Sequence, residues 1–210
     1  MASTAPGHLK ARKLPRQARA AVTRDAIFEA TIQLLVADGP HRLTTTRVAE
    51  RAGVSVGTLY QYFPHKQALL FALNERYLDV LSGKIEATCI AHHGSQMNLM
   101  IEALIETYWN AKTERADVTR ALYRTAVELD NEALMEAFAA RVDAATLAMF
   151  ASASDWQRDD LASVNLTLMT VIFGTVRNAF ERNLPPAQIE ALRRQLPKMC
   201  LGYLGRTGTD

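Results

Sequence analysis

Two short helical patterns, separated by a turn that contains glycine, make up the segment LTTTRVAERAGVSVGTLYQYF, Leu43–Phe63. Thr44 is a good N-cap for the first pattern, because its hydroxyl can accept a backbone N–H of the following turn. Gly53 suits the left-handed conformation that ends a helix, and Ser55 can cap the second pattern. The segment therefore predicts a helix-turn-helix, a motif that can place its second helix in the major groove of DNA.

The second helix of this motif, over about residues 56–63, is expected to have one buried and one exposed face. At 100° per residue, Val56, Leu59 and Phe63 fall on the side that packs against the preceding helices. The opposite face is short and uncharged, and its groups can hydrogen-bond to base edges or phosphates. The candidates for DNA contact on this face, at its flank and at the start of the following helix are Gly57, Thr58, Tyr60, Gln61, Tyr62 and Lys66.

This segment resembles the tetracycline-repressor (TetR/AcrR) family of bacterial regulators over about residues 22–73. The matching residues are Leu43-Thr44-Thr45, Val48-Ala49, Ala52-Gly53-Val54-Ser55, Gly57-Thr58-Leu59-Tyr60, Tyr62-Phe63, Lys66 and Leu69-Leu70. The remainder matches only in length, helix content and helix order. The resemblance implies a recognition helix at 56–62, phosphate contacts from the second helix and from Lys66, and a two-fold dimer. It adds five candidates for DNA contact, which are Thr45, Thr46, Arg47, Ser55 and Val56. Thr44 and Ser55 could instead serve only as caps.

The charge is divided unevenly along the 210 residues. Residues 1–70 hold 10 Lys and Arg against 4 Asp and Glu, a balance of +6, and residues 71–210 hold 14 against 18, a balance of −4. This fits a basic nucleic-acid-binding head, with a solubilising basic tail as the alternative. Cys89 and Cys200 form no zinc or disulfide pattern, so no metal or cofactor is expected. Since no signal peptide or membrane span is evident, we expect a soluble, cytoplasmic protein.

Helical periodicity continues through nearly all of the chain, so an all-α fold is predicted. We expect a flexible basic arm over residues 1–20, a three-helix DNA-binding domain over 21–67, and a ligand-binding and dimerisation body over 68–206 that a long helix joins to the head. The predicted helices are at about 23–38, 44–53, 56–63, directly after Pro64-His65, 97–113, 117–129, 131–153, 159–182 and 186–204.

Two sets of apolar residues in the body have candidate roles. In the resembled family the last two long helices pair with a second subunit, and the residues assigned to that interface are Leu168, Ile172, Val176, Leu192, Leu196 and Met199. Burial within one subunit is the alternative. Residues that could line a ligand cavity, or form simple core, are Met100, Tyr108, Trp109, Tyr123, Phe138 and Phe173. Glu102 and Glu106 could balance a cationic ligand, unless they form a solvated helix face.

The predicted function is sequence-specific regulation of transcription. We expect a homodimeric repressor that binds a palindromic double-stranded DNA operator and is released by a small apolar or amphipathic effector. A ligand-binding or adaptor protein of the same fold, without specific DNA binding, is an alternative. An all-α enzyme is a further one, but the chain lacks Glu-x-x-His pairs, a glycine-rich phosphate loop, G-x-S-x-G and H-E-x-x-H, so no catalytic residue is assigned.

Overall fold

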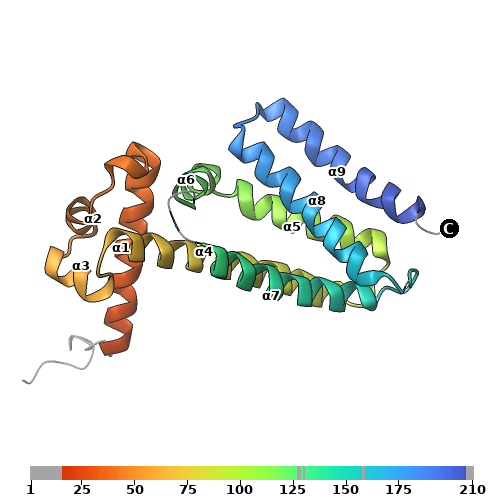
Figure 1. Cartoon of the computed structure of the whole chain (residues 1–210), viewed down its shortest axis with the longest axis horizontal. Helices are drawn as coiled ribbons and strands as arrows, with labels where there is room; N and C mark the ends of the chain where they lie inside the picture. The colour runs from red at the N-terminus through yellow and green to blue at the C-terminus, as the bar shows by residue number, and fades with distance from the viewer. Residues whose placement is uncertain (1–15, 127–128, 130, 158, 207–210) are drawn as a thin grey trace, which may run out of the picture. The chain divides into compact units, whose positions relative to one another are not determined.

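The structure, a computed structural model, describes residues 16–126, 129, 131–157 and 159–206. The chain divides into two compact units between Lys66 and Gln67, which we call the head and the body (Figure 1). Every regular element in the described ranges is a helix, so the predicted all-α fold class is confirmed. None of the helices in these ranges combines the length and hydropathy that a membrane span requires.

The head contains α1 (Arg16–Asp38), the 3₁₀-helix η2 (Pro40–Arg42), α2 (Thr45–Ala52) and α3 (Val56–Tyr62). The α2 helix packs against both α1 and α3. These helices share one apolar core, because each contributes side chains that are almost fully buried. Its main members are Ile27, Leu34, Leu35, Leu43, Val48, Leu59 and Phe63. The packing of Leu59 and Phe63 in this core fixes which face of α3 is turned outward.

The first helix begins earlier than its sequence pattern predicted. The expected arm over residues 1–20 lies largely outside the described residues, but its last five residues belong to α1, which begins at Arg16 rather than near Thr23. Residues 16–21 read RQARAA, and Arg, Gln and Ala are strong helix formers. Local helix propensity therefore extends α1 into the segment expected to be flexible.

The end of α1 is where the sequence predicted it. Gly39 follows the last helical residue, Asp38, and adopts a φ of 76°, in the range that favours glycine. The one-turn helix η2, which was not expected, starts at the buried Pro40. Gly39 and Pro40 together turn the chain from α1 into the helix-turn-helix.

The body is built from the remaining helices, which are α4 (Lys66–Ala91), α5 (Met97–Thr113), α6 (Ala116–Ala126), α7 (Glu132–Ala151), α8 (Leu161–Glu181) and α9 (Pro186–Arg206). The helices α5 to α9 agree with their predicted ranges to within about three residues at each end. The Asp155 carboxylate accepts a hydrogen bond from the Met97 N–H at 2.8 Å, so the chain that follows α7 caps the start of α5.

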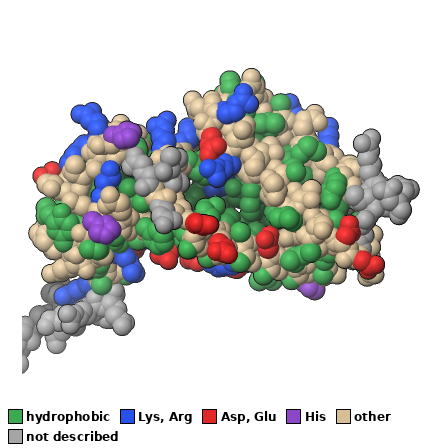
Figure 2. Space-filling view, in the orientation of Figure 1, with side chains coloured by type: hydrophobic (Ala, Val, Ile, Leu, Met, Phe, Trp, Pro, Cys, Tyr) green, Lys and Arg blue, Asp and Glu red, His purple; other side chains and the backbone are tan. Residues whose placement is uncertain are grey.

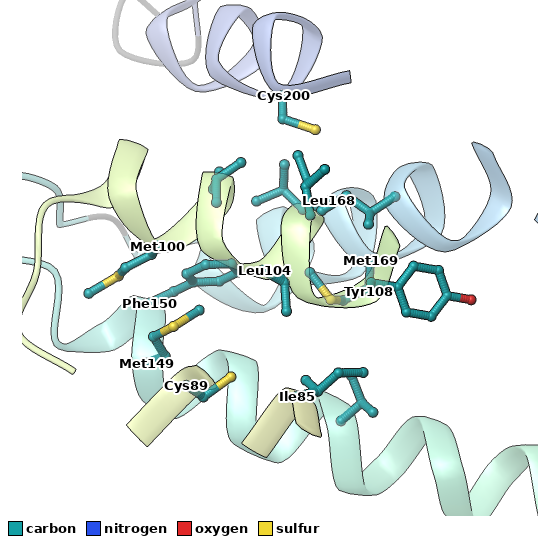
Figure 3. Packing of buried hydrophobic residues seen from close by; sticks show 14 of the residues in the cluster. Ile85, Cys89, Met100, Leu104, Tyr108, Met149, Phe150, Leu168, Met169 and Cys200 are labelled. Carbon is teal, nitrogen blue, oxygen red and sulfur yellow. The ribbon is translucent and has the colours of Figure 1, made fainter. Parts of the chain in front are cut away.

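The α5 helix lies in the middle of the body and packs against α6, α7, α8 and α9. In Figure 3 its residues Met100 and Leu104 lie between Cys89 of α4 on one side and Cys200 of α9 on the other. Trp109, also on α5, is 1% exposed. One side of α5 is exposed, at Glu102 and Glu106, and the rest of the helix is largely buried. A polar residue on the buried side therefore needs an explanation.

Both cysteines are buried and unpaired. Burial raises the pKa of Cys89 and of Cys200 to about 11, so each thiol stays neutral at physiological pH. No group of His, Cys, Asp or Glu suited to a metal ion occurs among the residues that the structure describes.

Candidate functional sites

The helix-turn-helix is fixed at its caps by the residues that the sequence predicted for this role. The Thr44 hydroxyl accepts a hydrogen bond from the Arg47 N–H at 3.3 Å, and the Ser55 hydroxyl accepts one from the Thr58 N–H at 2.9 Å. Gly53 adopts a φ of 68° at the end of α2. The two caps and the left-handed glycine together set the angle at which α3 leaves the turn.

The outer face of α3 carries polar groups without charge. Leu59 is fully buried, and the Phe63 ring packs 5.4 Å from that of Phe28, measured between centroids. Gly57, Tyr60 and Gln61 are exposed, with Tyr60 at 47%. The predicted division of α3 into a packing face and an open face is therefore present. The remaining candidates on this helix, at intermediate exposure, are Val56, Thr58 and Tyr62.

Two hydroxyl pairs hold the exposed face in place. Thr45 Oγ1 on α2 lies 3.1 Å from the Tyr60 hydroxyl on α3, and Ser55 Oγ lies 2.8 Å from Thr58 Oγ1. The Gln61 amide has no hydrogen-bond partner within the described part of the chain, so it is available to an external group. The face thus combines a positioned tyrosine with an uncommitted amide, a donor and acceptor set suited to base edges.

The cations predicted to contact phosphates are held by the head itself. Arg47 Nη2 lies 2.5 Å from Asp38 Oδ2, and its Nη1 donates to the Arg42 carbonyl at 2.8 Å. The hydrogen bond from Arg47 lowers the pKa of Asp38. Lys66 Nζ donates to the Pro40 carbonyl at 2.8 Å. Both cations therefore tie neighbouring elements together, whereas Thr46 is exposed. Sequence spacing gave no signal for the Asp38 pair, because the two residues lie on different helices.

The body contains a cavity of about 450 Å³ between α4, α5, α6, α7 and α8. In Figure 2 the body shows a hollow with hydrophobic side chains at its floor and charged ones at its edge. Four of the six residues proposed from sequence to bind a ligand line the cavity, namely Tyr108, Tyr123, Phe138 and Phe173. The other two, Met100 and Trp109, are buried in the core and are not part of this lining. The rings of Tyr108 and Phe173 stack with centroids 4.3 Å apart.

A lysine that the sequence argument missed enters this cavity from α5. Lys112 is 2% exposed, and its Nζ donates to the Tyr77 hydroxyl at 3.2 Å. Nζ also lies 4.7, 5.3 and 5.0 Å from the ring centroids of Tyr77, Tyr108 and Tyr123. Burial lowers the pKa of Lys112 to about 7. Its position in the sequence could have revealed it, because Lys112 continues the buried stripe of Ile105 and Tyr108 at helical spacing.

The two glutamates that could have balanced a cationic ligand lie elsewhere. Glu106 pairs with Arg193 of α9 and accepts a hydrogen bond from the Asn110 amide at 2.9 Å. The hydrogen bond from Arg193 lowers the pKa of Glu106. Glu102 is exposed, and neither glutamate lines the cavity. The surroundings of the two glutamates therefore fit a solvated helix face rather than a ligand site.

The residues assigned to a subunit interface are mostly inside the body. Leu168, Ile172, Val176 and Leu196 are each at most 2% exposed within the single chain. Their stripe packs on the chain's own core and so offers no surface to a partner. Of the two remaining, Leu192 is partly buried and Met199 is 53% exposed. The large apolar side chain that α8 does expose is Leu166, at 63%.

Comparisons with known sequences cover both units. Residues 27–73 match the family described as bacterial regulatory proteins, tetR family, and residues 97–204 match the tetracyclin repressor-like C-terminal domain. Nucleoid occlusion factor SlmA of Actinobacillus pleuropneumoniae is 34% identical over 109 residues, 51% of this chain and 53% of that protein. Tetracycline repressor protein class C of Escherichia coli is 44% identical over 57 residues, 27% of this chain and 26% of that protein. The chain thus matches about half, or less, of the length of these relatives.

Comparison with solved structures extends over almost the whole chain. The fatty acid degradation regulator FadR from Bacillus halodurans superposes with a TM-score of 0.67 and 17% identity, over 91% of this chain and 97% of that one. At this identity the similarity concerns the fold alone. The family matches over residues 27–73 and 97–204 identify the family, and they confirm the resemblance drawn from the helix-turn-helix. The chain belongs to the TetR family of bacterial regulatory proteins.

Proposed function

We propose that the protein is a transcriptional regulator that reads DNA with the exposed face of α3. The main support for this proposal is the open space around Gly57. Outside its own helix backbone and adjoining residues, a Cβ at this position would have one described neighbour within 4 Å, the Ser55 hydroxyl at 3.8 Å. The head therefore has no internal need for a glycine here, although glycine costs a helix about 0.5–1 kcal/mol relative to alanine. A surface that must approach another backbone closely does need it.

The side chains around Gly57 fit the same role. The Gln61 amide can pair bidentately with adenine, and the Tyr60 and Thr58 hydroxyls can reach base edges or phosphates. We assign contacts with the DNA backbone to Thr46 and Tyr62. We assign Arg47 and Lys66 a smaller share of the phosphate contacts, because each would have to exchange an acceptor within the head for a phosphate oxygen.

Specific binding by so short a helix calls for two heads on one DNA. Two recognition helices on one face of B-DNA lie about 34–36 Å apart, and a two-fold dimer therefore binds a palindromic operator. We assign the dimer contact to the outward faces of α8 and α9, around Leu166 and Met199, since both are large apolar side chains left exposed. The four buried residues named from the sequence play no part in this revised interface.

The cavity in the body supports control by a small molecule. A volume of about 450 Å³ falls within the range of small-molecule sites, and its lining is mostly aromatic and aliphatic. We propose that an effector bound here releases the DNA, and that the protein acts as a repressor. Linkage requires that such an effector bind the DNA-free form more tightly.

The test begins with in vitro selection of DNA bound by the full-length protein. A symmetric consensus is expected, with half-sites about one helical turn apart. Gln61→Ala should then change the preferred base at one position of each half-site and cost about 1–3 kcal/mol at the original base. The matched control is Gln188→Ala, an exposed glutamine of α9. Selection of no consensus, or an unchanged consensus with Gln61→Ala, would refute the assignment of the α3 face.

The match to nucleoid occlusion factors favours a second candidate, a role in nucleoid occlusion. The two candidates differ in where the protein lies on the chromosome. Chromatin immunoprecipitation should place a transcriptional regulator at a few promoters. Many sites spread along the chromosome, without preference for promoters, would favour the second candidate.

A further inference from the structure

The buried ammonium group of Lys112 needs a counter-charge. A charged group in an apolar environment carries a large desolvation penalty unless it is paired. Lys112 is 2% exposed, and the hydrogen-bond acceptor that it has among the described residues is the neutral Tyr77 hydroxyl. The tyrosine rings around Nζ supply attraction through their π faces, which is weaker than an ion pair.

The described part of the cavity wall does not supply that counter-charge. The described lining residues include no Asp or Glu. They do include a second cation, Arg177 of α8, whose guanidinium lies 5.8 Å from the Tyr123 ring centroid. Arg177 Nε pairs with Glu181 at 2.7 Å, one turn along the same helix. Arg177 therefore has a carboxylate partner, whereas Lys112 has none among the described residues.

The groups that face Lys112 come from four helices. They are Tyr77 of α4, Tyr108 of α5, Tyr123 of α6 and Arg177 of α8, while the lining residues of α7 are not ionisable. Burial raises the pKa of all three tyrosines, so they remain neutral and can donate hydrogen bonds. Arg177 adds positive potential. This surrounding is complementary to an anion and repels a cation.

We propose that the cavity binds a small organic monocarboxylate with an alkyl or aromatic body, whose carboxylate pairs with Lys112 while its body packs against Tyr108, Phe138 and Phe173. The ammonium and the phenol hydroxyls fix the carboxylate, and the stacked rings of Tyr108 and Phe173 accept the apolar part. This assignment names the chemical class of the effector, and it rests on the proposed function only for its consequence on DNA.

Lys112 should take up a proton as the ligand binds. The pKa of Lys112 near 7 means that the amine is partly neutral without an anion beside it, and a carboxylate favours the ammonium form. Affinity for a carboxylate should therefore fall as the pH rises above about 7. A neutral ligand would show no such dependence, and a cationic one would show the opposite.

Titration calorimetry of the full-length protein without DNA tests the proposal, with octanoate and 2-naphthoate as probes. Each is compared with its neutral amide, octanamide or 2-naphthamide, and octylammonium is the cationic control. We expect the carboxylates to bind about tenfold or more tightly than their amides, as a charge-assisted pair implies. The better of the two carboxylates reports whether the cavity prefers an alkyl or an aromatic body.

Lys112→Met keeps the length of the side chain and removes its charge. This variant should lose the preference for the carboxylate and the pH dependence, yet still bind the amides. The matched control is Lys198→Met, an exposed lysine of α9, which should change neither. Circular dichroism should be used to check that both variants are folded. Lys112→Arg, which keeps the charge, should retain a preference for the anion.

The carboxylates that follow α6 in the sequence, Glu128 and Asp130, lie outside the described residues. If neither of them pairs with Lys112, as the proposal requires, the double variant E128Q/D130N should leave octanoate binding within about twofold. A gain of about tenfold would mean that one of them neutralises Lys112, and would overturn the proposal. Equal affinity for carboxylate and amide, tighter binding of octylammonium, or an unchanged preference in Lys112→Met would also overturn it.

Failure of this inference can be told apart from failure of the proposed function. Protein that binds its selected DNA but no carboxylate refutes the carboxylate site alone. Protein that binds a carboxylate through Lys112 without any change in DNA affinity keeps the site and refutes the effector switch. Fluorescence anisotropy of labelled DNA, with and without octanoate, separates the two results.

Discussion

The hydroxyl oxygen of Thr45 lies 3.1 Å from that of Tyr60, so a single hydrogen bond joins α2 to the outer face of α3. The Tyr60 ring is 47% exposed, and this bond holds its hydroxyl against α2. The bond therefore links the fold of the head to the positioning of a side chain that we assign to DNA.

Removing this bond should weaken DNA binding more than it weakens the fold. Thr45→Val keeps the shape of the side chain and loses its hydroxyl, and we expect a loss of about 0.5–1 kcal/mol in the free energy of unfolding. Tyr60→Phe should lose a similar amount, and the double variant should lose no more than either alone. Urea denaturation and DNA anisotropy measure the two effects. Thr46→Val, next to Thr45 and exposed, is the stability control; additive losses in the double variant would contradict a shared bond.

Gly57→Ala should separate stability from DNA binding. Alanine is favoured over glycine within a helix, and its Cβ would make only ordinary van der Waals contact here. The free energy of unfolding should therefore rise by about 0.5–1 kcal/mol. The added methyl should nevertheless weaken DNA binding, because it holds the helix away from the groove. Thermal denaturation and anisotropy test the two parts, and unimpaired DNA binding in this more stable variant would remove the main support for the α3 interface.

Asp38→Asn should release the Arg47 guanidinium from its ion pair. A freed cation at the start of α2 can take an additional phosphate contact, which would steepen the slope of log K against log salt by about 0.9. Arg47→Met should leave the slope nearly unchanged if Arg47 stays on Asp38 in the complex. A flattening by about 0.9 in Arg47→Met would show instead that the ion pair breaks when DNA binds.

The buried lysine should make stability depend on pH in a defined direction. The pKa of Lys112 is lowered in the folded protein to about 7 from 10.5. Between these values the unfolded chain binds more protons, so the free energy of unfolding rises with pH from about 7 to 10.5. Below pH 7 the full cost of the buried charge remains, and Lys112→Met should raise the melting temperature most there. A parallel pH profile in Lys112→Met and the unaltered protein would contradict this.

Charging the exposed apolar residues of α8 and α9 should disrupt the proposed dimer. Leu166→Glu and Met199→Glu place a carboxylate where two copies would meet, so light scattering after size exclusion should detect monomers, and operator affinity should fall. Ile90→Glu makes the same change at a side chain of α4 that is 77% exposed, and should leave both unchanged. Persistence of the dimer in Leu166→Glu/Met199→Glu would exclude this face.

The sequence predicted the features that depend on neighbouring residues. Caps at Thr44 and Ser55, and the left-handed Gly53, follow from local backbone chemistry, and the boundaries of α5 to α9 follow from turn residues and periodicity. The start of α1 was missed because a basic composition suggested a solvated arm, whereas the same residues are strong helix formers.

Features that depend on which distant residues meet could not be predicted in this way. The α8 helix is apolar on more than one side, so its sequence alone did not tell whether Leu168 or Leu166 faces the chain's own core. The Asp38–Arg47 pair joins two helices without a fixed spacing. Lys112 became significant only when Tyr77 and Tyr123, from two other helices, were found around its ammonium group.

The outer face of α3 bears no charge, and this separates two properties of a regulator that are usually measured together. Electrostatic attraction to phosphates weakens as ionic strength rises, but hydrogen bonds between neutral groups and base edges hardly respond to it. Binding through Gly57, Tyr60 and Gln61 should therefore keep the same order of preference among sites while total occupancy falls. A bacterium under osmotic stress would change how many of its sites are filled and leave unchanged which of them fill first.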